Sequence, residues 1–221
     1  MEQRFRDRHD GGRRLAAALG SYAGQEGLLV LALPRGGVPV GYEVARTLGA
    51  PLDVMQVRKL GVPGHEELAM GAIASGGVRI LSEGVVATFR IPDRVIATVA
   101  AAEEQELDRR ERIYREGRPF PEVRGRTVIL VDDGLATGAT MRAAAAALRA
   151  QGPGWLVAAV PVAPKETCDA LRDLVDEVIC VVTPEPFFAV GEWYEDFTQT
   201  SDADVRDLLR RAAAGARAQR L

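Results

Sequence analysis

Cysteine and histidine are scarce in this sequence, and their scarcity excludes several kinds of site. The 221 residues include two cysteines and two histidines. Cys168 and Cys180 are too far apart for a Cys-x-x-Cys site, and two histidines do not supply a clustered zinc site. We therefore expect both cysteines to be reduced residues that pack in the interior.

An excess of positive charge and a long apolar run are also missing. The formal net charge is -3 and the pI is about 5.6, so the chain lacks the basic footprint that nucleic-acid backbones select. No segment reaches the apolar length that spans a bilayer. Residues 1–14 are charged, unlike the apolar centre of a signal peptide. These features predict a soluble, cytoplasmic protein without nucleic-acid or membrane partners.

Hydrophobic residues make up 47% of the chain, and many of them form short runs separated by helical patterns. The alternation of strand and helix indicates an α/β fold, namely a doubly wound, mainly parallel five-stranded sheet flanked by helices. In such a sheet the ligand site lies at the carboxyl ends of the strands. We expect one domain with its core at about residues 25–182. The runs typical of buried strands are residues 28–33, 52–57, 128–131, 155–160 and 177–182.

One stretch, residues 126–140, joins a strand to a helix through an acidic pair and a turn of small residues. Asp132 and Asp133 close the apolar run. The first N–H groups of the following helix lack intrahelical partners and lie at the positive end of its dipole, which favours a phosphate. Carboxylates accept hydrogen bonds from vicinal hydroxyls, so the stretch predicts a site for a ribose 5-phosphate. The phosphate-binding residues predicted here are Ala136, Thr137, Gly138, Ala139 and Thr140.

The run Val-Asp-Asp-Gly-Leu-Ala-Thr-Gly-Ala-Thr at residues 131–140 resembles the phosphoribosyl-pyrophosphate (PRPP) motif of type I phosphoribosyltransferases. It has neither the Gly-Lys-Ser/Thr of a Walker A loop nor the G-x-G-x-x-G of a dinucleotide site. The resemblance implies a Mg²⁺-dependent transferase in which a nitrogen heterocycle attacks PRPP and pyrophosphate leaves. The metal would be held through PRPP near Asp132 and Asp133, which are predicted catalytic residues as well as ligand-binding ones.

Two further segments end predicted strands at the same edge. Pro34-Arg-Gly-Gly37 resembles the pyrophosphate loop of the family: Arg35 supplies a guanidinium, while Gly36 and Gly37 allow an unusual backbone, with a strained peptide expected between Arg35 and Gly36. Arg58 and Lys59 would compensate the charge of the departing pyrophosphate, which makes Lys59 a predicted catalytic residue too. An ordinary glycine turn and a solvated pair of cations are the alternatives.

Residues 61–77 are rich in glycine and predict a mobile loop that closes over the reacting centre. Residues 70–74 and 78–81 are expected to pair as a hairpin at its base. Glu66 or Glu67 would transfer a proton at the acceptor, although a solvated charged loop is an equal alternative. Residues 92–116 predict one long helix that lies over the core or contacts another subunit. It carries three pairs of an acid and an arginine at i,i+4 spacing, namely Glu106/Arg110, Asp108/Arg112 and Glu111/Arg115.

The nature of the acceptor is predicted from residues other than those that bind PRPP. In the 6-oxopurine enzymes of this family an aspartate often precedes Thr-Gly, whereas this sequence has Ala136, as in the adenine-type motif. The family's acceptor is contacted by a small hood of terminal segments, placed here at about residues 183–221 together with the N-terminal segment. Phe188, Trp193 and Tyr194 are weak acceptor-binding candidates because aromatic rings stack on planar bases. A hydrophobic cluster that anchors the C-terminal helix is the alternative.

The predicted activity is transfer of the ribose 5-phosphate of PRPP to a nitrogen heterocycle such as a nucleobase, by a homodimer acting in nucleotide metabolism. A PRPP- or nucleotide-sensing regulatory protein is an alternative on the same fold. Arg35, Lys59 and the loop acids favour catalysis over sensing. PRPP synthesis is a second alternative, but it normally needs two such domains and this chain supplies one.

Overall fold

The computed structural model describes residues 4–218, and its centre is a five-stranded sheet. The strand order is β2-β1-β6-β7-β8, and every neighbouring pair is parallel. The predicted α/β class and the predicted sheet are confirmed. The strands are β1 (Leu28–Ala32), β2 (Leu52–Val54), β6 (Thr127–Val131), β7 (Trp155–Val162) and β8 (Glu177–Val182).

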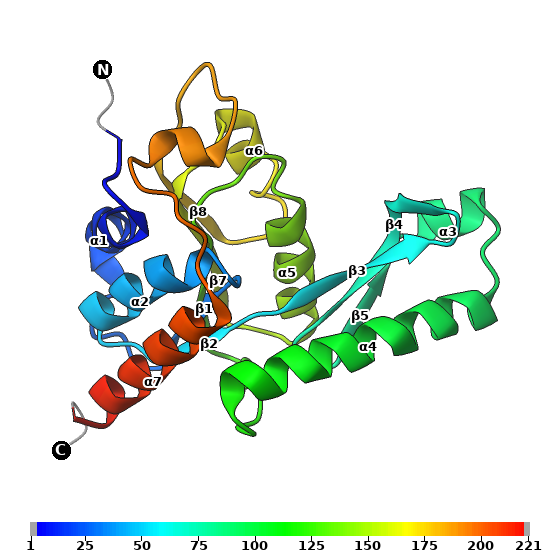
Figure 1. Cartoon of the computed structure of the whole chain (residues 1–221), viewed down its shortest axis with the longest axis horizontal. Coiled ribbons are helices and arrows are strands. Elements are labelled where there is room, and N and C mark those ends of the chain that lie inside the picture. The colour runs from blue at the N-terminus through cyan, green and yellow to red at the C-terminus, as the bar shows by residue number, and fades with distance from the viewer. Residues whose placement is uncertain (1–3, 219–221) are drawn as a thin grey trace.

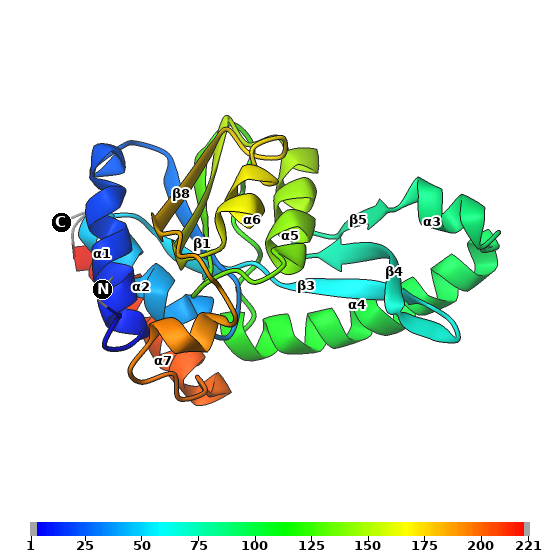
Figure 2. The same cartoon turned by 90° about the horizontal axis from the view of Figure 1, so that it is seen from above.

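Helices cover both faces of this sheet. Val30 and Ala32 of β1 pack into one apolar cluster, whereas Leu29 and Leu31 pack into another, which is why the strand is apolar throughout. Figures 1 and 2 show α1, α2 and α7 against one face and α5 and α6 against the other. These helices are α1 (Arg8–Ala18), α2 (Gly37–Leu48), α5 (Ala139–Ala150), α6 (Lys165–Asp169) and α7 (Asp202–Ala218), with 3-10 turns η1 (Gly20–Tyr22) and η2 (Val190–Trp193).

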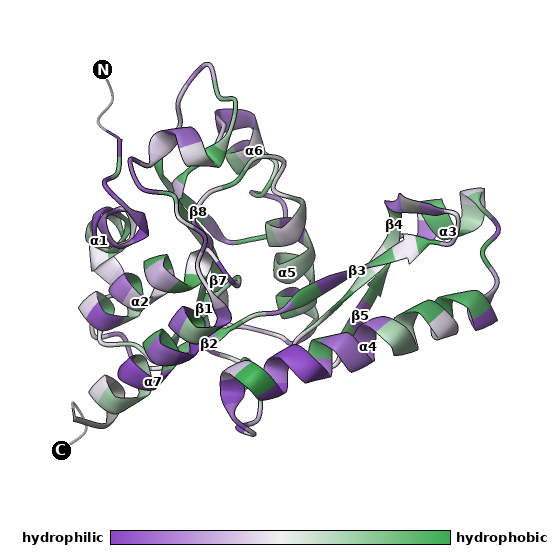
Figure 3. Ribbon diagram, viewed as in Figure 1, coloured by the Kyte–Doolittle hydropathy of each residue, from purple (hydrophilic) through white to green (hydrophobic). Residues whose placement is uncertain are grey.

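A second unit, which we call the arm (residues 57–115), projects from the sheet (Figures 1 and 2). Its three strands pair antiparallel in the order β3-β4-β5. The apolar residues Leu60 and Met70 of these strands pack against Ile96 and Leu107 of α4. Hydrophilic residues dominate the C-terminal half of α4 (Figure 3). The elements of the arm are β3 (Val57–Val62), β4 (His65–Ala74), β5 (Val78–Leu81), α3 (Glu83–Thr88) and α4 (Asp93–Arg115).

The arm corrects two predictions and confirms two. The predicted strand 52–57 is split, because Gln56 leaves the parallel sheet and bonds Ser75, whose N–H donates to the Gln56 carbonyl at 2.9 Å. The predicted mobile loop is instead the continuous strand β4 through most of its length, since it has an apolar face that α4 covers. The hairpin of residues 70–74 with 78–81 is confirmed, as is the long helix that begins after Pro92.

A buried arginine joins the arm to the sheet. Arg115, at the end of α4, is only 1% exposed. Its Nε donates to Asp53 Oδ1 at 2.9 Å, and its Nη2 donates to the Val54 carbonyl at 2.5 Å. Its Nη1 lies 2.7 Å from Glu111 Oε1. The predicted Glu111–Arg115 pair therefore forms, but as part of a buried joint.

The two terminal segments meet beside the C-terminal ends of β7 and β8. The Phe5 N–H donates to the Trp193 carbonyl at 2.8 Å, and the Glu195 N–H donates to the Phe5 carbonyl at 2.8 Å. The rings of Phe5 and Tyr194 lie 5.3 Å apart. Within residues 4–218, no helix combines the length and apolarity needed to cross a membrane.

Candidate functional site

Two loops that are about a hundred residues apart in sequence touch at the carboxyl edge of the sheet. A Cβ on Gly36 would lie 2.0 Å from Asp133 Oδ2, and a Cβ on Gly37 would lie 2.8 Å from the Val131 carbonyl oxygen. A side chain at Gly36 would displace the Asp133 carboxylate, and one at Gly37 would meet backbone atoms, so glycine allows the two loops to approach this closely. The structure thus brings the predicted pyrophosphate loop directly against the predicted ribose-binding pair, Asp132 and Asp133.

The loop Pro34–Gly37, the predicted pyrophosphate loop, differs from its prediction in one detail. The unusual peptide is a cis bond between Pro34 and Arg35, one position before the expected one. The Arg35 side chain is 39% exposed, and its Nη1 lies 3.9 Å from Asp202 Oδ1 at the start of α7. Its guanidinium is therefore accessible beside the loop.

The loop at residues 136–140 leads into α5 as predicted. Gly138 takes a left-handed φ of 68° as the N-cap, and α5 begins at Ala139. The Arg142 N–H donates to the Gly138 carbonyl at 2.9 Å. The N–H groups of the residues before Arg142 therefore have no acceptor within the helix. Thr137 and Thr140 are exposed. The loop can therefore present backbone and hydroxyl donors to a phosphate.

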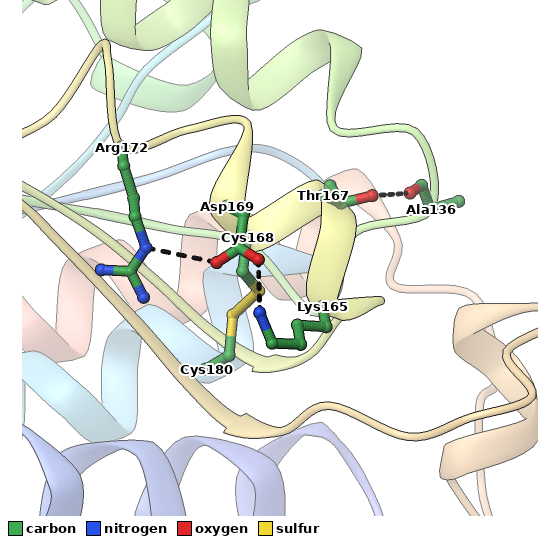
Figure 4. The surroundings of a disulfide bond; sticks show 7 residues. All are labelled: Ala136, Lys165, Thr167, Cys168, Asp169, Arg172 and Cys180. Carbon is green, nitrogen blue, oxygen red and sulfur yellow. Dashed lines mark hydrogen bonds and ion pairs between the residues drawn. A yellow bond between two sulfur atoms is a disulfide. The ribbon is translucent and has the colours of Figure 1, made fainter.

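Two side chains that the sequence reasoning missed hold this loop. Thr167 Oγ1 of α6 donates to the Ala136 carbonyl at 2.8 Å (Figure 4), and a Cβ on Gly138 would lie 2.8 Å from Thr167 Cγ2. Arg142 Nη1 donates to the Thr137 carbonyl at 2.6 Å. The Arg142 contact is five residues away in sequence and could have been anticipated, whereas Thr167 reaches the loop only through the tertiary fold.

The prediction of two reduced cysteines is wrong for this structure. Cys168 of α6 and Cys180 of β8 form a disulfide (Figure 4). The sequence places the two cysteines twelve positions apart, but it does not reveal that α6 packs beside β8. Cys168 follows Thr167, whose side chain bonds the loop at residues 136–140. The disulfide therefore links α6, which contacts this loop, to the edge strand β8.

The sequence also did not reveal that Arg8 contacts the acidic pair. Its Nε donates to Asp133 Oδ2 at 2.7 Å and its Nη1 donates to the Thr198 carbonyl at 2.7 Å. Its guanidinium also lies 3.9 Å from the centroid of the Phe197 ring. The first helix thus supplies a cation to the acidic pair.

Burial and mutual repulsion shape the acidic pair. Burial raises the pKa of Asp132, and the neighbouring Asp133 carboxylate raises it further. Burial also raises the pKa of Asp133, while the hydrogen bond and charge of Arg8 oppose that rise. Asp132 Oδ1 accepts the Asp133 N–H at 2.9 Å. The site therefore holds carboxylates that gain from a ligand able to donate hydrogen bonds or carry positive charge.

Among the described residues, the predicted arm residues Arg58, Lys59 and Glu67 make no hydrogen bond or ion pair with either loop. Arg58 Nη2 lies 2.5 Å from Glu103 Oε2 of α4, so its charge is paired within the arm. Lys59 is exposed on β3, and Glu67 is exposed on β4, which begins at the distal end of the arm (Figures 1 and 2). Glu66 is also on β4, but its side chain lies outside the described residues.

The three aromatic candidates occupy different environments. Tyr194 is buried, and its hydroxyl donates to the Asp133 carbonyl at 2.5 Å, which places it beneath the acidic pair. Trp193 is half-buried against Phe5 and its neighbours. Phe188 is 76% exposed. Tyr194 therefore supports the site from the hood side, and its ring stacks on Phe197 at 5.2 Å.

The residues present fit a magnesium ion only when a substrate accompanies it. Among the described residues, no group of three or more His, Cys, Asp or Glu side chains is placed to hold a metal. Asp132 and Asp133 provide two carboxylates, and Mg²⁺ is usually bound by one or two carboxylates together with substrate phosphates and water. The acidic pair would hold such an ion, or the hydroxyls attached to it.

The sequence profile of the phosphoribosyl transferase domain matches residues 5–196. This range contains both loops, the acidic pair and Arg8. The chain belongs to this family. The resemblance seen in the motif at residues 131–140 is therefore confirmed over nearly the whole chain.

Known relatives agree with this membership. A Mycobacterium tuberculosis (strain H37Rv) protein named as a phosphoribosyl transferase is 48% identical over 208 residues, which are 94% of this chain and 47% of that protein. The chain thus spans about half the length of the curated relatives that it matches. A ribose-phosphate pyrophosphokinase of Methanopyrus kandleri is 39% identical over 105 residues, which are 44% of this chain and 36% of that protein.

A solved structure shares the whole architecture. The protein TT1426 from Thermus thermophilus is 44% identical to this chain and superimposes with a TM-score of 0.83, over 95% of this chain and 99% of that one. Because the match covers both chains nearly completely, it includes the arm as well as the parallel sheet.

Proposed function

We propose that this chain transfers the ribose 5-phosphate of PRPP to a nitrogen heterocycle and releases pyrophosphate. One observation carries the proposal: Gly36 and Gly37 pack directly on Asp133 and Asp132. The contact supports the proposal because the loop would bind pyrophosphate beside carboxylates that would bind ribose, and the start of α5 follows them in the chain. The order of groups matches the order along PRPP itself.

Each part has a separate role in the proposed reaction. The loop at residues 136–140 binds the 5-phosphate through backbone N–H groups and the hydroxyls of Thr137 and Thr140. Asp132 and Asp133 accept hydrogen bonds from the ribose hydroxyls. The bond from the anomeric carbon to the pyrophosphate oxygen breaks with its electron pair leaving on pyrophosphate, and a bond to the acceptor nitrogen forms.

The acidic pair stabilises the positive charge that develops on the sugar as this bond breaks. A bound Mg²⁺ would supply further neutralisation of the leaving pyrophosphate. Arg35 compensates the same charge from the side of the cis peptide, and Arg8 keeps Asp133 oriented until a ligand replaces its hydrogen bond. These roles depend on position and charge rather than on a covalent intermediate.

The acceptor is proposed to be a nucleobase-like heterocycle, and the working form a homodimer. A proton that the acceptor loses would pass to Glu66 or Glu67 if the arm moves toward the loops, and otherwise to water. Phe188, Trp193 and Tyr194 remain the candidates for contact with the base. Of these, Tyr194 is committed to the Asp133 carbonyl, which leaves Phe188 and Trp193 as the better ones.

A PRPP-sensing role is the second candidate, and one observation favours it. β4, which carries Glu67, begins at the far end of the arm (Figure 1), so no predicted proton-transfer group of the described residues lies beside the acidic pair. A sensor needs the binding groups and no proton acceptor.

Pyrophosphate release tests the proposal against the sensor. The reaction mixture would contain PRPP, Mg²⁺ and each of a panel of purines and pyrimidines. We expect release with at least one base, and a loss of about 10² or more in the Asp132→Asn and Asp133→Asn variants, equivalent to about 2.7 kcal/mol of transition-state stabilisation. Asp207→Asn on the exposed surface of α7 is the matched control and should keep full activity. Tight PRPP binding without release from any base would favour the sensor.

A further inference from the structure

Helix α6 is tied to its surroundings through two adjacent residues (Figure 4). Thr167 Oγ1 donates to the carbonyl of Ala136, in the loop at residues 136–140, at 2.8 Å. Cys168, the next residue, forms the disulfide with Cys180 of the edge strand β8. The hydrogen bond to the loop and the covalent link to the sheet therefore leave the helix from neighbouring residues.

The other polar side-chain contacts of α6 are internal. Asp169 Oδ2 lies 2.5 Å from Lys165 Nζ, and Asp169 Oδ1 lies 3.3 Å from Arg172 Nε, so these ion pairs stay within residues 165–172. The helix has only five residues, and a helix this short is unstable without tertiary contacts. Besides the apolar packing of Cys168 in the core, the position of the Thr167 hydroxyl therefore depends on the disulfide.

The loop in turn relies on Thr167. The threonine is 7% exposed, and a Cβ on Gly138 would lie 2.8 Å from Thr167 Cγ2, so its methyl group packs against the loop that its hydroxyl bonds. A shift of α6 would break the hydrogen bond to the Ala136 carbonyl and this contact together. The loop would then open more often.

The disulfide lies where a small thiol can reach it. In the described sheet, β8 is an edge strand with β7 as its neighbour. Cys180 is half-buried, whereas Cys168 is 5% exposed. Access to a sulfur atom is one of the factors that set the rate of thiol–disulfide exchange. We therefore expect a thiolate to attack at the Cys180 sulfur.

We propose that the Cys168–Cys180 disulfide is a redox switch for the loop at residues 136–140. A thiolate of a dithiol attacks the Cys180 sulfur, the bond between the two cysteines breaks, and Cys168 leaves as a thiolate that takes up a proton. The second thiol of the reductant then displaces Cys180 from the mixed disulfide. Both cysteines are reduced, and the dithiol is oxidised to its own disulfide. Exchange with a disulfide of the same class reverses the step.

Reduction lowers the order of the loop because the constraint exists only in the oxidised protein. It releases α6 from β8, and the hold of Thr167 on the Ala136 carbonyl weakens. The loop opens more often, and it binds a phosphate group more weakly as a consequence. Only this last effect rests on the proposed function.

Hydrogen exchange of the amides at residues 136–142 tests the switch without any ligand. In the wild type, reduction by dithiothreitol should speed this exchange about two- to tenfold, the factor that corresponds to the loss of one ordinary hydrogen bond. Exchange at residues 57–62 of the arm should not change and serves as the internal reference. Free thiols are counted in each sample to verify its redox state.

Three variants locate the effect. Cys168→Ala/Cys180→Ala should exchange as the reduced wild type does and should not respond to the reductant. Thr167→Val keeps the disulfide but removes the hydroxyl, so its loop should exchange rapidly in both redox states. Glu166→Gln is the matched control: Glu166 is exposed beside Thr167 on the same helix, and this variant should respond as the wild type does. Thermal unfolding verifies the fold of each variant.

Equal loop exchange in the oxidised and reduced wild type would overturn the switch, as would two free thiols that persist after treatment with oxidised glutathione. Calorimetric titration with PRPP and Mg²⁺ separates the switch from the proposed function. Weaker binding to the reduced protein supports both. Faster exchange on reduction, with no PRPP binding in either state, would retain the control of the loop and lose the proposed function. Equal exchange with equal PRPP binding would lose the switch alone.

Discussion

At the scale of single residues, Asp132 links function to stability. Its pKa is raised above the ordinary 3.8 by burial and by Asp133. Between 3.8 and the raised pKa, the folded protein binds a proton that the unfolded chain has released, so stability falls as pH rises through this window. Asp132→Asn removes this loss. We expect the variant to have the higher Tm at pH 7, by about 2–4 °C for each kcal/mol recovered, with the gain shrinking as pH approaches 3.8.

Asp133→Asn is the matched comparison for this prediction. The Arg8 hydrogen bond and charge oppose the rise in the pKa of Asp133, and the substitution also removes that ion pair. Its gain in Tm should therefore be smaller than that of Asp132→Asn. Equal or lower stability of Asp132→Asn at pH 7, measured by calorimetry, would show that the buried charge carries no net cost.

Gly36 tests the contact between the two loops. A Cβ at this position would lie 2.0 Å from Asp133 Oδ2, so Gly36→Ala must displace the acidic side chain or the loop. We expect PRPP affinity to fall at least about tenfold, or 1.4 kcal/mol, in an equilibrium titration. Gly20→Ala, where a Cβ meets no atom within 4 Å, should bind as the wild type does. Unchanged affinity in Gly36→Ala would mean that the loop contact is irrelevant to the ligand.

At the scale of elements, the arm depends on the buried Arg115. Arg115→Met keeps much of the volume but leaves Asp53 and Glu111 as unpaired buried or half-buried charges. Breaking such a pair usually costs about 3–5 kcal/mol, which urea unfolding would measure. Arg112→Met, an exposed position on the same helix, should cost far less. Similar losses of unfolding free energy in both variants would mean that the Arg115 ion pairs do not stabilise the arm.

Helices and strands were predictable from the sequence where the signals that define them are local. The long helix was predictable because its signals are local: Pro92 precedes its first turn, and Glu116 and Gly117 take positive φ values at its end. The break between β2 and β3 was not, because it depends on the bond between Gln56 and Ser75, nineteen residues apart. The sequence predicts a loop where the structure has strand β4 for the same reason, since the face of α4 that covers the strand comes later in the chain.

At the scale of the whole molecule, the candidate site draws on distant parts of the chain. The sequence predicted the two loops and the acidic pair, whose residue types are themselves the signal. It did not reveal Arg8 or Thr167, because an arginine in the first helix and a threonine in a short one are ordinary until the fold places them at Asp133 and Ala136.

The disulfide adds a prediction at this scale. Cys168 and Cys180 are 12 residues apart, and closing a loop of about this length stabilises a protein by roughly 3 kcal/mol in the chain-entropy account. Reduction should lower stability by that order in urea unfolding. The Cys168→Ala/Cys180→Ala variant should show no response to reductant. If reductant leaves the wild type unchanged, the disulfide does not contribute to stability in solution.

We propose that the two loops and the acidic pair form one site for PRPP, and a binding titration can test whether they do. PRPP with Mg²⁺ would be titrated by calorimetry into the wild type and the Asp132→Asn/Asp133→Asn variant, with inorganic pyrophosphate as the parallel ligand. Because the carboxylates are assigned to the ribose, PRPP affinity should fall at least about tenfold in the variant while pyrophosphate affinity does not fall. PRPP binding that is equally tight in both proteins would mean that the acidic pair does not bind the ribose.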